Sequence, residues 1–318
     1  MMVPAPAEAG SCVPLGAVAL VLAVLGCALP AHAQLAAPNS AGVAMGHLHY
    51  RVRDVEANKR FWVTLGAQPV DARAVRGDDG NLREGRVLDL DRDSRAAAVQ
   101  VLKLPDVLVF LEQGESSGGT EGSIVNHVAF RVPSLAAVEK AGLGVARLQG
   151  FPGVASVMTP EGERVELFEN AATNLTFTYD NGQPNPVSDR HNRPATLPIA
   201  FHHIHLYLPE GAVAEAKAWY VRLFGGVPGR RSQYEAVDLP GVNLNLSVGP
   251  RPTVPTAGRM LDHIGFEVTG LQAFCERLRG MGITFESGYS RDGSGYGTAV
   301  LVDPWGTRIE LTEGLRRY

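Results

Sequence analysis

Short runs of alternating apolar and polar residues recur along the chain, and four of them begin with a histidine. They cover residues 47–52, 127–132, 203–208 and 263–268 and open on His47, His127, His203 and His263. A period of two is typical of a half-buried β-strand. The pattern therefore predicts four strands that each open on a histidine.

After each of these strands the apolar spacing changes to that of a helix. Asp54 precedes a helical pattern at residues 55–65, and Ser134 precedes a shorter one, so both residues are placed as helix N-caps. Two more helices are expected at residues 212–224 and 271–281. Further strand patterns follow each helix, so the order strand, helix, then two or three strands occurs four times.

A fourfold repeat of this kind decides the architecture more firmly than any single element. The copies are βαβββ modules at residues 46–113, 125–170, 199–250 and 261–316. The second and fourth copies end alike, with a Pro-x-Gly turn leading into a strand that carries Glu166 or Glu310 at its middle.

One module is too small to bury a core alone, so we expect modules that follow each other in sequence to pair. This gives an α+β fold of two domains with cupped mixed sheets, at residues 46–170 and 199–316. The segment between them, residues 171–198, has turn-forming residues and no periodicity, and we interpret it as a linker.

The N-terminus is a different kind of sequence. Residues 1–33 are mostly apolar and end in a small-residue pattern at Ala33, which predicts a cleaved signal peptide and an exported protein, periplasmic or secreted. No Lys or Arg precedes Arg51, and a lipoprotein anchored through Cys27 is the alternative. The apolar run is short of the ~20 residues of a membrane span, so we expect no span after cleavage, and residues 34–45 as a flexible leader.

Composition describes an ordinary globular protein. The chain has 318 residues, 45% hydrophobic and 19% charged, with a formal net charge of −4, and this balance gives no electrostatic case for a nucleic-acid partner. Of Cys12, Cys27 and Cys275 only the last would survive signal cleavage. An internal disulfide and a cysteine zinc site are therefore excluded in the mature chain.

The histidines and glutamates of paired modules can converge on a cation. We group His47, His127 and Glu166 in the first half and His203, His263 and Glu310 in the second. Two imidazoles and a carboxylate suit one divalent Fe, Mn, Ni, Co or Zn ion per site. A single histidine at a strand start is usually structural, and it is the same set occurring twice that favours metal binding.

Several neighbouring residues are further candidates for these sites. Glu112, late in the last strand of the first module, is a candidate fourth ligand, and Ser247 is its counterpart in the third module. His49 and His205 share a strand face with the opening histidines, and we expect them behind the ligands or at the surface. His202 should point to the opposite face.

Tandem βαβββ modules, His-headed strands and Pro-x-Gly-x-x-h-Glu-Leu endings resemble the vicinal oxygen chelate superfamily. It includes glyoxalase I, extradiol dioxygenases, methylmalonyl-CoA epimerase and bleomycin- or fosfomycin-resistance proteins. The resemblance implies a Lewis-acid metal and a small-molecule substrate with vicinal oxygens. The glyoxalase-type set of two His and two Glu is matched by His47, Glu112, His127 and Glu166, which favours a lyase or isomerase.

In such chemistry a ligand glutamate moves the proton, and this gives Glu166 and Glu310 as catalytic candidates. An extradiol dioxygenase remains an alternative, although Val300 and Ser156 occupy the places of that group's tyrosine. A non-catalytic small-molecule binder is the third reading. A homodimer is left open.

Overall fold

The computed structural model places most of the chain that follows the apolar N-terminus. It describes residues 1–2, 35–70, 75–76, 82–83, 99–119, 121–170, 177–185, 198–250, 253–293 and 295–318. Ala33–Tyr318 form one compact unit, which contains all the helices and strands given below. The expected signal peptide and the alternative anchor at Cys27 thus lie outside the described residues, apart from the first two. No helix in the described ranges has the length and apolarity needed to cross a membrane.

Each module opens with a long strand followed by a helix, as the sequence predicts. The first contains β1 (Val43–Val52), α1 (Val55–Leu65), β2 (Gln68–Pro69), β3 (Val75–Arg76), β4 (Leu82–Arg83), β5 (Val99–Leu104) and β6 (Val107–Gln113). The second contains β7 (Val125–Val132), α2 (Leu135–Lys140), β8 (Ala146–Arg147), β9 (Val154–Met158) and β10 (Arg164–Glu169), and β11 (Phe177–Thr178) follows in the expected linker.

The two later modules repeat this order. The third contains β12 (Ala200–Leu208), α3 (Val213–Phe224), β13 (Val227–Arg231), β14 (Tyr234–Leu239) and β15 (Val242–Val248). The fourth contains β16 (Leu261–Val268), α4 (Leu271–Gly280), β17 (Phe285–Arg291), β18 (Gly297–Val302) and β19 (Arg308–Glu313), and the 3₁₀ helix η2 (Leu315–Arg317) ends the chain.

The modules pair differently from the order in sequence. One sheet runs β17-β18-β19-β16-β1-β6-β5-β2 and joins the first module to the fourth. The other runs β11-β13-β14-β15-β12-β7-β10-β9-β8 and joins the second to the third. The seams are antiparallel, β1 against β16 and β7 against β12. The expected domains, residues 46–170 and 199–316, are corrected accordingly.

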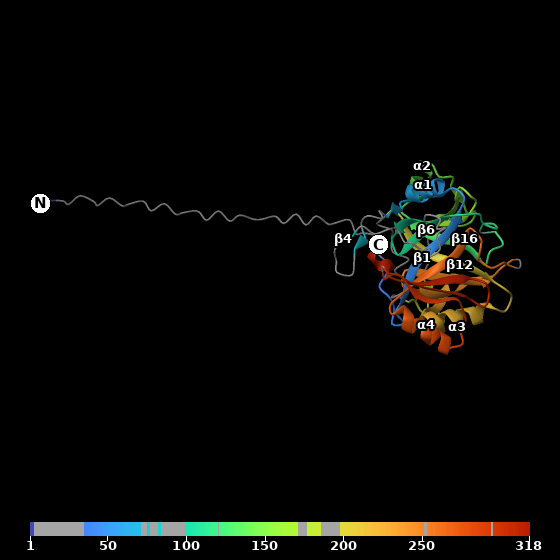
Figure 1. The fold of residues 1–318 in the computed structure, drawn as a ribbon. Coiled ribbons are helices and arrows are strands. Elements are labelled where there is room, and N and C mark those ends of the chain that lie inside the picture. Colours follow the sequence, from blue (N-terminus) through green and yellow to red (C-terminus); the bar gives the residue numbers. More distant parts are fainter. Residues whose placement is uncertain are drawn as a thin grey trace. The chain divides into compact units, whose positions relative to one another are not determined.

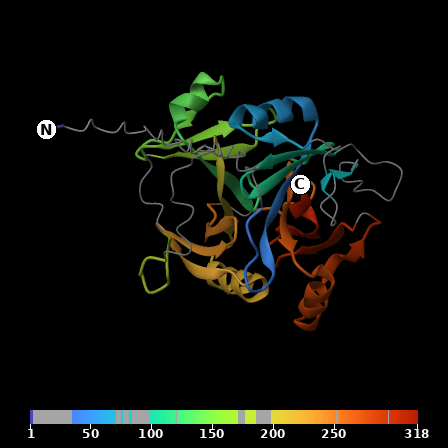
Figure 2. The same cartoon turned by 90° about the vertical axis from the view of Figure 1, so that its left-hand side faces the viewer.

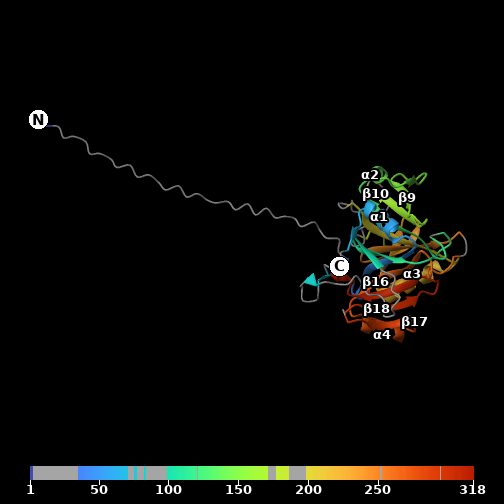
Figure 3. The same cartoon turned by 45° about the horizontal axis from the view of Figure 1, so that its top comes forward.

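Helix packing explains how modules that follow each other stay in contact while their strands pair elsewhere. In two views α1 and α2 lie on one side of the strands and α3 and α4 on the other (Figures 1 and 2), and Figure 3 shows α2 and α4 at opposite ends. Trp62 of α1 contacts Phe130 of β7, with ring centroids 5.5 Å apart, and Phe224 of α3 contacts Phe266 of β16 at 4.9 Å. One hydrophobic cluster therefore runs through all four modules.

Local signals in the sequence agree with the structure at some element ends and differ at others. Asp54 Oδ1 accepts a hydrogen bond from the Ala57 amide, which confirms the predicted cap of α1, whereas Ser134 makes no such bond at α2. β1 begins at Val43, inside the expected flexible leader, because that residue and the next two are fully buried. Cys275 packs in the core, as expected.

Candidate metal centres

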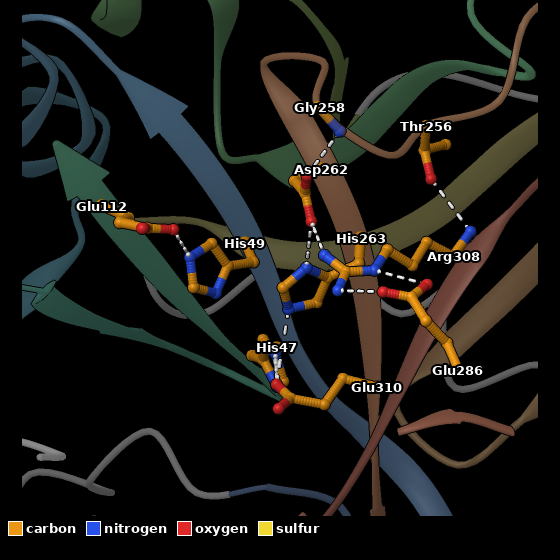
Figure 4. Close-up of polar contacts among 10 residues, drawn as sticks. All are labelled: His47, His49, Glu112, Thr256, Gly258, Asp262, His263, Glu286, Arg308 and Glu310. Atoms are coloured by element: carbon orange, nitrogen blue, oxygen red, sulfur yellow. Dashed lines mark hydrogen bonds and ion pairs between the residues drawn. The ribbon is translucent and has the colours of Figure 1, made fainter. Parts of the chain in front are cut away.

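Three predicted ligands meet where β1 and β16 run side by side. His47 comes from β1, His263 from β16 and Glu310 from β19 (Figure 4). Glu310 Oε2 lies 3.0 Å from His47 Nε2 and 3.4 Å from His263 Nε2. We call these three residues the β1–β16 site.

Strand register explains why these side chains converge. Gly265 is the residue of β16 that pairs with both His47 and Glu310. A Cβ atom on this glycine would come within 2.1 Å of the His47 ring. The missing side chain is thus what gives the imidazole its place.

The ring nitrogens of this site are arranged as metal ligands would be. His263 Nδ1 donates to Asp262 Oδ1 at 2.7 Å, so the neutral ring presents the Nε2 lone pair toward Glu310. Among the described residues, Nε2 of His47 and Nε2 of His263 are buried and lack hydrogen-bond geometry with any partner. Buried polar atoms are rarely left without a hydrogen-bond partner. A cation bound between the two imidazoles and the carboxylate would satisfy both nitrogens.

Charges behind the ligands strengthen this arrangement. Asp262 also accepts hydrogen bonds from the Gly258 amide and from Arg308 Nη1, both at 2.6 Å. Burial opposes its ionisation, but His263 and these two donors hold the pKa of Asp262 well below its usual range. Burial lowers the pKa of His47 to about 4, which keeps that ring neutral at pH 7.

The charge of Glu310 is fixed by the same neighbours. Burial alone would raise its pKa, but the close contacts with the imidazoles of His263 and His47 hold the pKa of Glu310 well below its usual range. For His263 burial lowers the pKa, and the contacts with Asp262 and Glu310 outweigh burial and raise it. The site therefore holds a permanent carboxylate beside two imidazoles.

A second histidine of β1 stands beside this site. His49 is 5% exposed, and its ring centroid lies 4.4 Å from that of His263. Its Nε2 lies 3.1 Å from Glu112 Oε2, while among the described residues its Nδ1 has no hydrogen-bond partner. His49 is thus buried near the cation position and is not at the surface.

The other sheet contains an equivalent cluster. His127 Nε2 lies 3.2 Å from Glu166 Oε2 and 3.1 Å from His203 Nε2. We call these three residues the β7–β12 site. They line a cavity of about 390 Å³. His205 occupies the place that His49 has in the first sheet, and its Nε2 lies 2.8 Å from the hydroxyl of Ser247.

The grouping expected from sequence order is therefore corrected. His47 does not combine with His127 and Glu166, nor His203 with His263 and Glu310. The physical reason is the strand pairing: β1 lies against β16 and β7 against β12. As metal ligands, these six residues remain a prediction.

The fourth ligand position also differs from the expected one. Glu166 pairs with Ala129, and Glu310 with Gly265, two residues after the opening histidine of each strand. In the first module the equivalent pair is His49 with Phe110, whose ring stacks on His47 at 4.4 Å. Glu112 lies two residues further on and contacts His49, so it does not complete the set.

The sequence held a signal for this register. Residues 110–114 and residues 310–314 both end in glycine, and counting back four places matches Phe110 to Glu310. In the third module the same position is Asn245, paired with His205. Among the described residues, each site thus brings one glutamate into contact with its histidines, Glu310 or Glu166, and no second one.

His202 was expected to face away from the site and does not. The register of β12 against β7 shifts between Phe201 and His203, so His202 occupies a β-bulge. A bulge re-aims the extra side chain. The ring lines the cavity, and its Nδ1 lies 2.7 Å from His203 Nδ1.

Comparison with known proteins agrees with the resemblance. Residues 200–311 match the sequence model of the Glyoxalase/Bleomycin resistance protein/Dioxygenase superfamily. Glyoxalase I from Zea mays has a similar fold, with a TM-score of 0.57 and 15% identity over 85% of this chain and 92% of that one. A "putative dioxygenase" from Bacillus subtilis gives a TM-score of 0.56 and 13% identity, covering 88% and 86%. No curated protein matches the chain in sequence.

Proposed function

We propose that the protein is a divalent-metal enzyme, because residues 200–311 match the model of this superfamily and the similarity to the fold of glyoxalase I extends over both halves of the chain. Its substrate is a small molecule with two neighbouring oxygens, such as a 2-oxo or 2-hydroxycarbonyl compound. The observation that carries the proposal is the β1–β16 site, where two buried imidazole nitrogens without hydrogen bonds face one carboxylate.

His47, His263 and Glu310 would hold the cation. Fe, Mn, Ni, Co and Zn all suit this ligand set. When bound, the ion supplies Lewis-acid polarisation of the substrate's oxygens. Phe110 occupies the position of a fourth ligand and excludes water from one side of His47.

The proton acceptor that we propose is His49, rather than Glu310. Glu310 is engaged with two imidazoles, and its lowered pKa makes it a weak base. Burial lowers the pKa of His49, which keeps the ring neutral at pH 7. With Glu112 accepting from Nε2, the lone pair of Nδ1 is free to take a proton from a substrate carbon.

Glu112 orients His49 and links it to solvent. Its side chain is 34% exposed and that of His49 is 7% exposed. The pair therefore resembles other dyads in which a carboxylate sets the tautomer of a catalytic imidazole. The chemistry that follows is proton transfer next to a polarised carbonyl, as in an isomerase or lyase.

The test is proton exchange at the carbon next to the carbonyl, followed by NMR in D₂O over a panel of 2-hydroxycarbonyl compounds. We expect Glu112→Gln to lower the exchange rate by about 100-fold at unchanged metal content. Glu115→Gln, at an exposed carboxylate three residues later, serves as the control and should keep the full rate. Equal rates in both variants would show that His49 and Glu112 are not the base.

A dioxygenase is the second candidate, favoured by one observation. Two histidines and a single carboxylate with open positions are also the ligand set of non-haem Fe(II) oxygenases. Oxygen uptake by the iron-loaded protein with a panel of catechols, without proton exchange on the carbonyl panel, would establish this alternative.

A further inference from the structure

We propose that the β7–β12 site is a metal-free pocket for a small organic carboxylate, so that each chain holds one metal ion and not two. The number of metal ions, one per chain, rests on the function proposed for the β1–β16 site. The character of the pocket does not, because it follows from the hydrogen bonds around His127.

Arg164 sets the tautomer of His127. Its Nη2 lies 3.0 Å from His127 Nδ1, and a guanidinium group can only donate. Nδ1 therefore accepts, and the ring proton is on Nε2, the atom that faces Glu166 and His203. A protonated nitrogen has no lone pair for a metal ion.

Asn126 is compatible with this tautomer. Its side-chain oxygen is placed 2.8 Å from His127 Nδ1. The oxygen and nitrogen of an amide have nearly the same shape, so a half-turn presents the amide N–H to the ring without moving other atoms. Arg164 has no such freedom, and two N–H groups facing each other at 3.0 Å would repel.

From His127 a chain of hydrogen bonds continues through His203 to His202, each ring donating to the next. His127 Nε2 donates to His203 Nε2 at 3.1 Å, and His203 Nδ1 then donates to His202 Nδ1 at 2.7 Å. The rings of His127 and His203 each accept one hydrogen bond and donate one. Both ring nitrogens of His127 and of His203 are thus hydrogen-bonded without a cation, whereas Nε2 of His47 and Nε2 of His263 have no such partner among the described residues.

A single residue difference accounts for the contrast between the sites. In the β1–β16 site Asp262 binds Arg308 at 2.6 Å and keeps the guanidinium off His263. Asn126 stands in the equivalent place of the other sheet and has no charge to hold an arginine. Arg164 instead reaches Glu166, at 3.3 Å, and His127.

The walls of the cavity indicate what it binds. Two guanidinium groups and one carboxylate line it, those of Arg164, Arg231 and Glu166, together with the rings of Phe168, Tyr207 and Tyr234. Guanidinium and phenol groups donate hydrogen bonds, and guanidinium binds carboxylate especially well. A volume of about 390 Å³ lies within the range of small-molecule pockets. The matching ligand is a small molecule with an apolar or aromatic body and one carboxylate.

The metal content of the purified, metal-loaded protein tests how many ions each chain binds. We expect about one ion per chain in the wild type, almost none in His47→Ala, and still about one in His203→Ala. Two ions in the wild type with one lost in His203→Ala would overturn the proposal. No ion in the wild type would refute the function proposed for the β1–β16 site, and the two measurements below would still decide the pocket.

Removing Arg164 tests the tautomer itself. In Arg164→Ala, His127 Nδ1 can donate to Asn126 and Nε2 regains its lone pair, so we expect a second ion to bind. The same second ion should bind in Arg164→Ala/His47→Ala, where the other site is disabled. Arg147→Ala, at an exposed arginine paired with Glu139, should gain none. Failure of Arg164→Ala to gain an ion would refute the role given to Arg164.

Calorimetric titration with benzoate, in the presence of a chelator, tests the ligand class. We expect the wild type to bind benzoate and Arg164→Ala to bind it at least tenfold more weakly. Benzyl alcohol, which keeps the ring and lacks the carboxylate, should bind both proteins equally weakly. Absence of benzoate binding, or equal binding by both proteins, would overturn the carboxylate assignment.

Discussion

Glu267 is a buried carboxylate on β16, on the same strand as His263 but outside the candidate metal site. It is 4% exposed and accepts hydrogen bonds from the amides of Gly314 and Leu315 and from the hydroxyl of Thr312. Burial outweighs these donors and raises the pKa of Glu267 from 4.5 to about 7. The folded protein therefore binds a proton that the unfolded chain releases above about pH 4.5.

The raised pKa of Glu267 makes the folded protein less stable as pH rises. Stability from the protonated side chain is complete below the unfolded pKa and is lost as pH rises through 7. The free energy of unfolding of the wild type, relative to Glu267→Gln, should fall by about 3 kcal/mol between pH 4 and pH 8. Urea unfolding at both pH values measures it. Glu276→Gln, an exposed control on α4, should show no such difference, and a flat profile for Glu267 would contradict the burial argument.

The identities of the candidate ligands could be predicted from sequence because the repeat marks them independently of how modules pair. The histidine that opens each strand and the glutamate after each Pro-x-Gly turn stand at fixed places in their own module. The role of Glu112 could not be obtained in this way. It depends on the register of β6 against β1, which puts Phe110 beside His49. A register shift of two residues would keep the same strand face inward, so the alternating pattern cannot distinguish between the two registers.

At the level of elements, the seam between β1 and β16 is built around a close approach. Gly265 stands opposite His47, whereas Ala129 stands opposite His203 in the other seam. The second seam thus accommodates a methyl group where the first has none. Small residues at such positions decide where a neighbouring ring can lie.

Gly265→Ala should therefore disturb the metal site more than the fold. The new Cβ would meet the buried His47 ring at 2.1 Å, so the ring must turn away from Glu310. Overpacking of this kind costs about 1–3 kcal/mol, and we expect metal affinity to fall at least tenfold while the fold remains. Equilibrium dialysis with the metal and thermal unfolding measure the two effects. Gly293→Ala, where a Cβ would meet nothing within 4 Å, is the control, and wild-type affinity in Gly265→Ala would disprove the steric account.

The choice of strand partner is the part of the fold that sequence order did not reveal. All four opening strands have similar apolar patterns, so β1 could pair with β7 or with β16 on local grounds. Non-local packing decides between them: Trp62 of α1 fills space against Phe130, while β1 itself pairs along its length with β16. The helices and strands could be predicted because their sequence signals are local. Which residues share a site could not be predicted, because it depends on the pairing of β1 with β16, strands that lie about two hundred residues apart in sequence.

For the whole molecule, the shared core has a thermodynamic consequence. Trp219 of α3 packs near Trp305 beyond β18, with ring centroids 6.2 Å apart, and Trp62 packs against Phe130 of the other sheet. Neither sheet can unfold without exposing part of the hydrophobic cluster of the other. We therefore expect Ala33–Tyr318 to unfold in one cooperative transition, although they contain two sheets and two sites.

Metal binding at the β1–β16 site should then stabilise both sheets equally. An ion at 100 times its dissociation constant adds about 2.7 kcal/mol, which for a chain of this size raises Tm by roughly 5 °C. Variants that keep only Trp62, Trp219 or Trp305 report on different modules by fluorescence, and all three should show the same shift on adding metal. A shift confined to Trp62 and Trp305, with Trp219 melting separately, would mean that the sheets fold as independent units and that the continuous core does not couple the two sites.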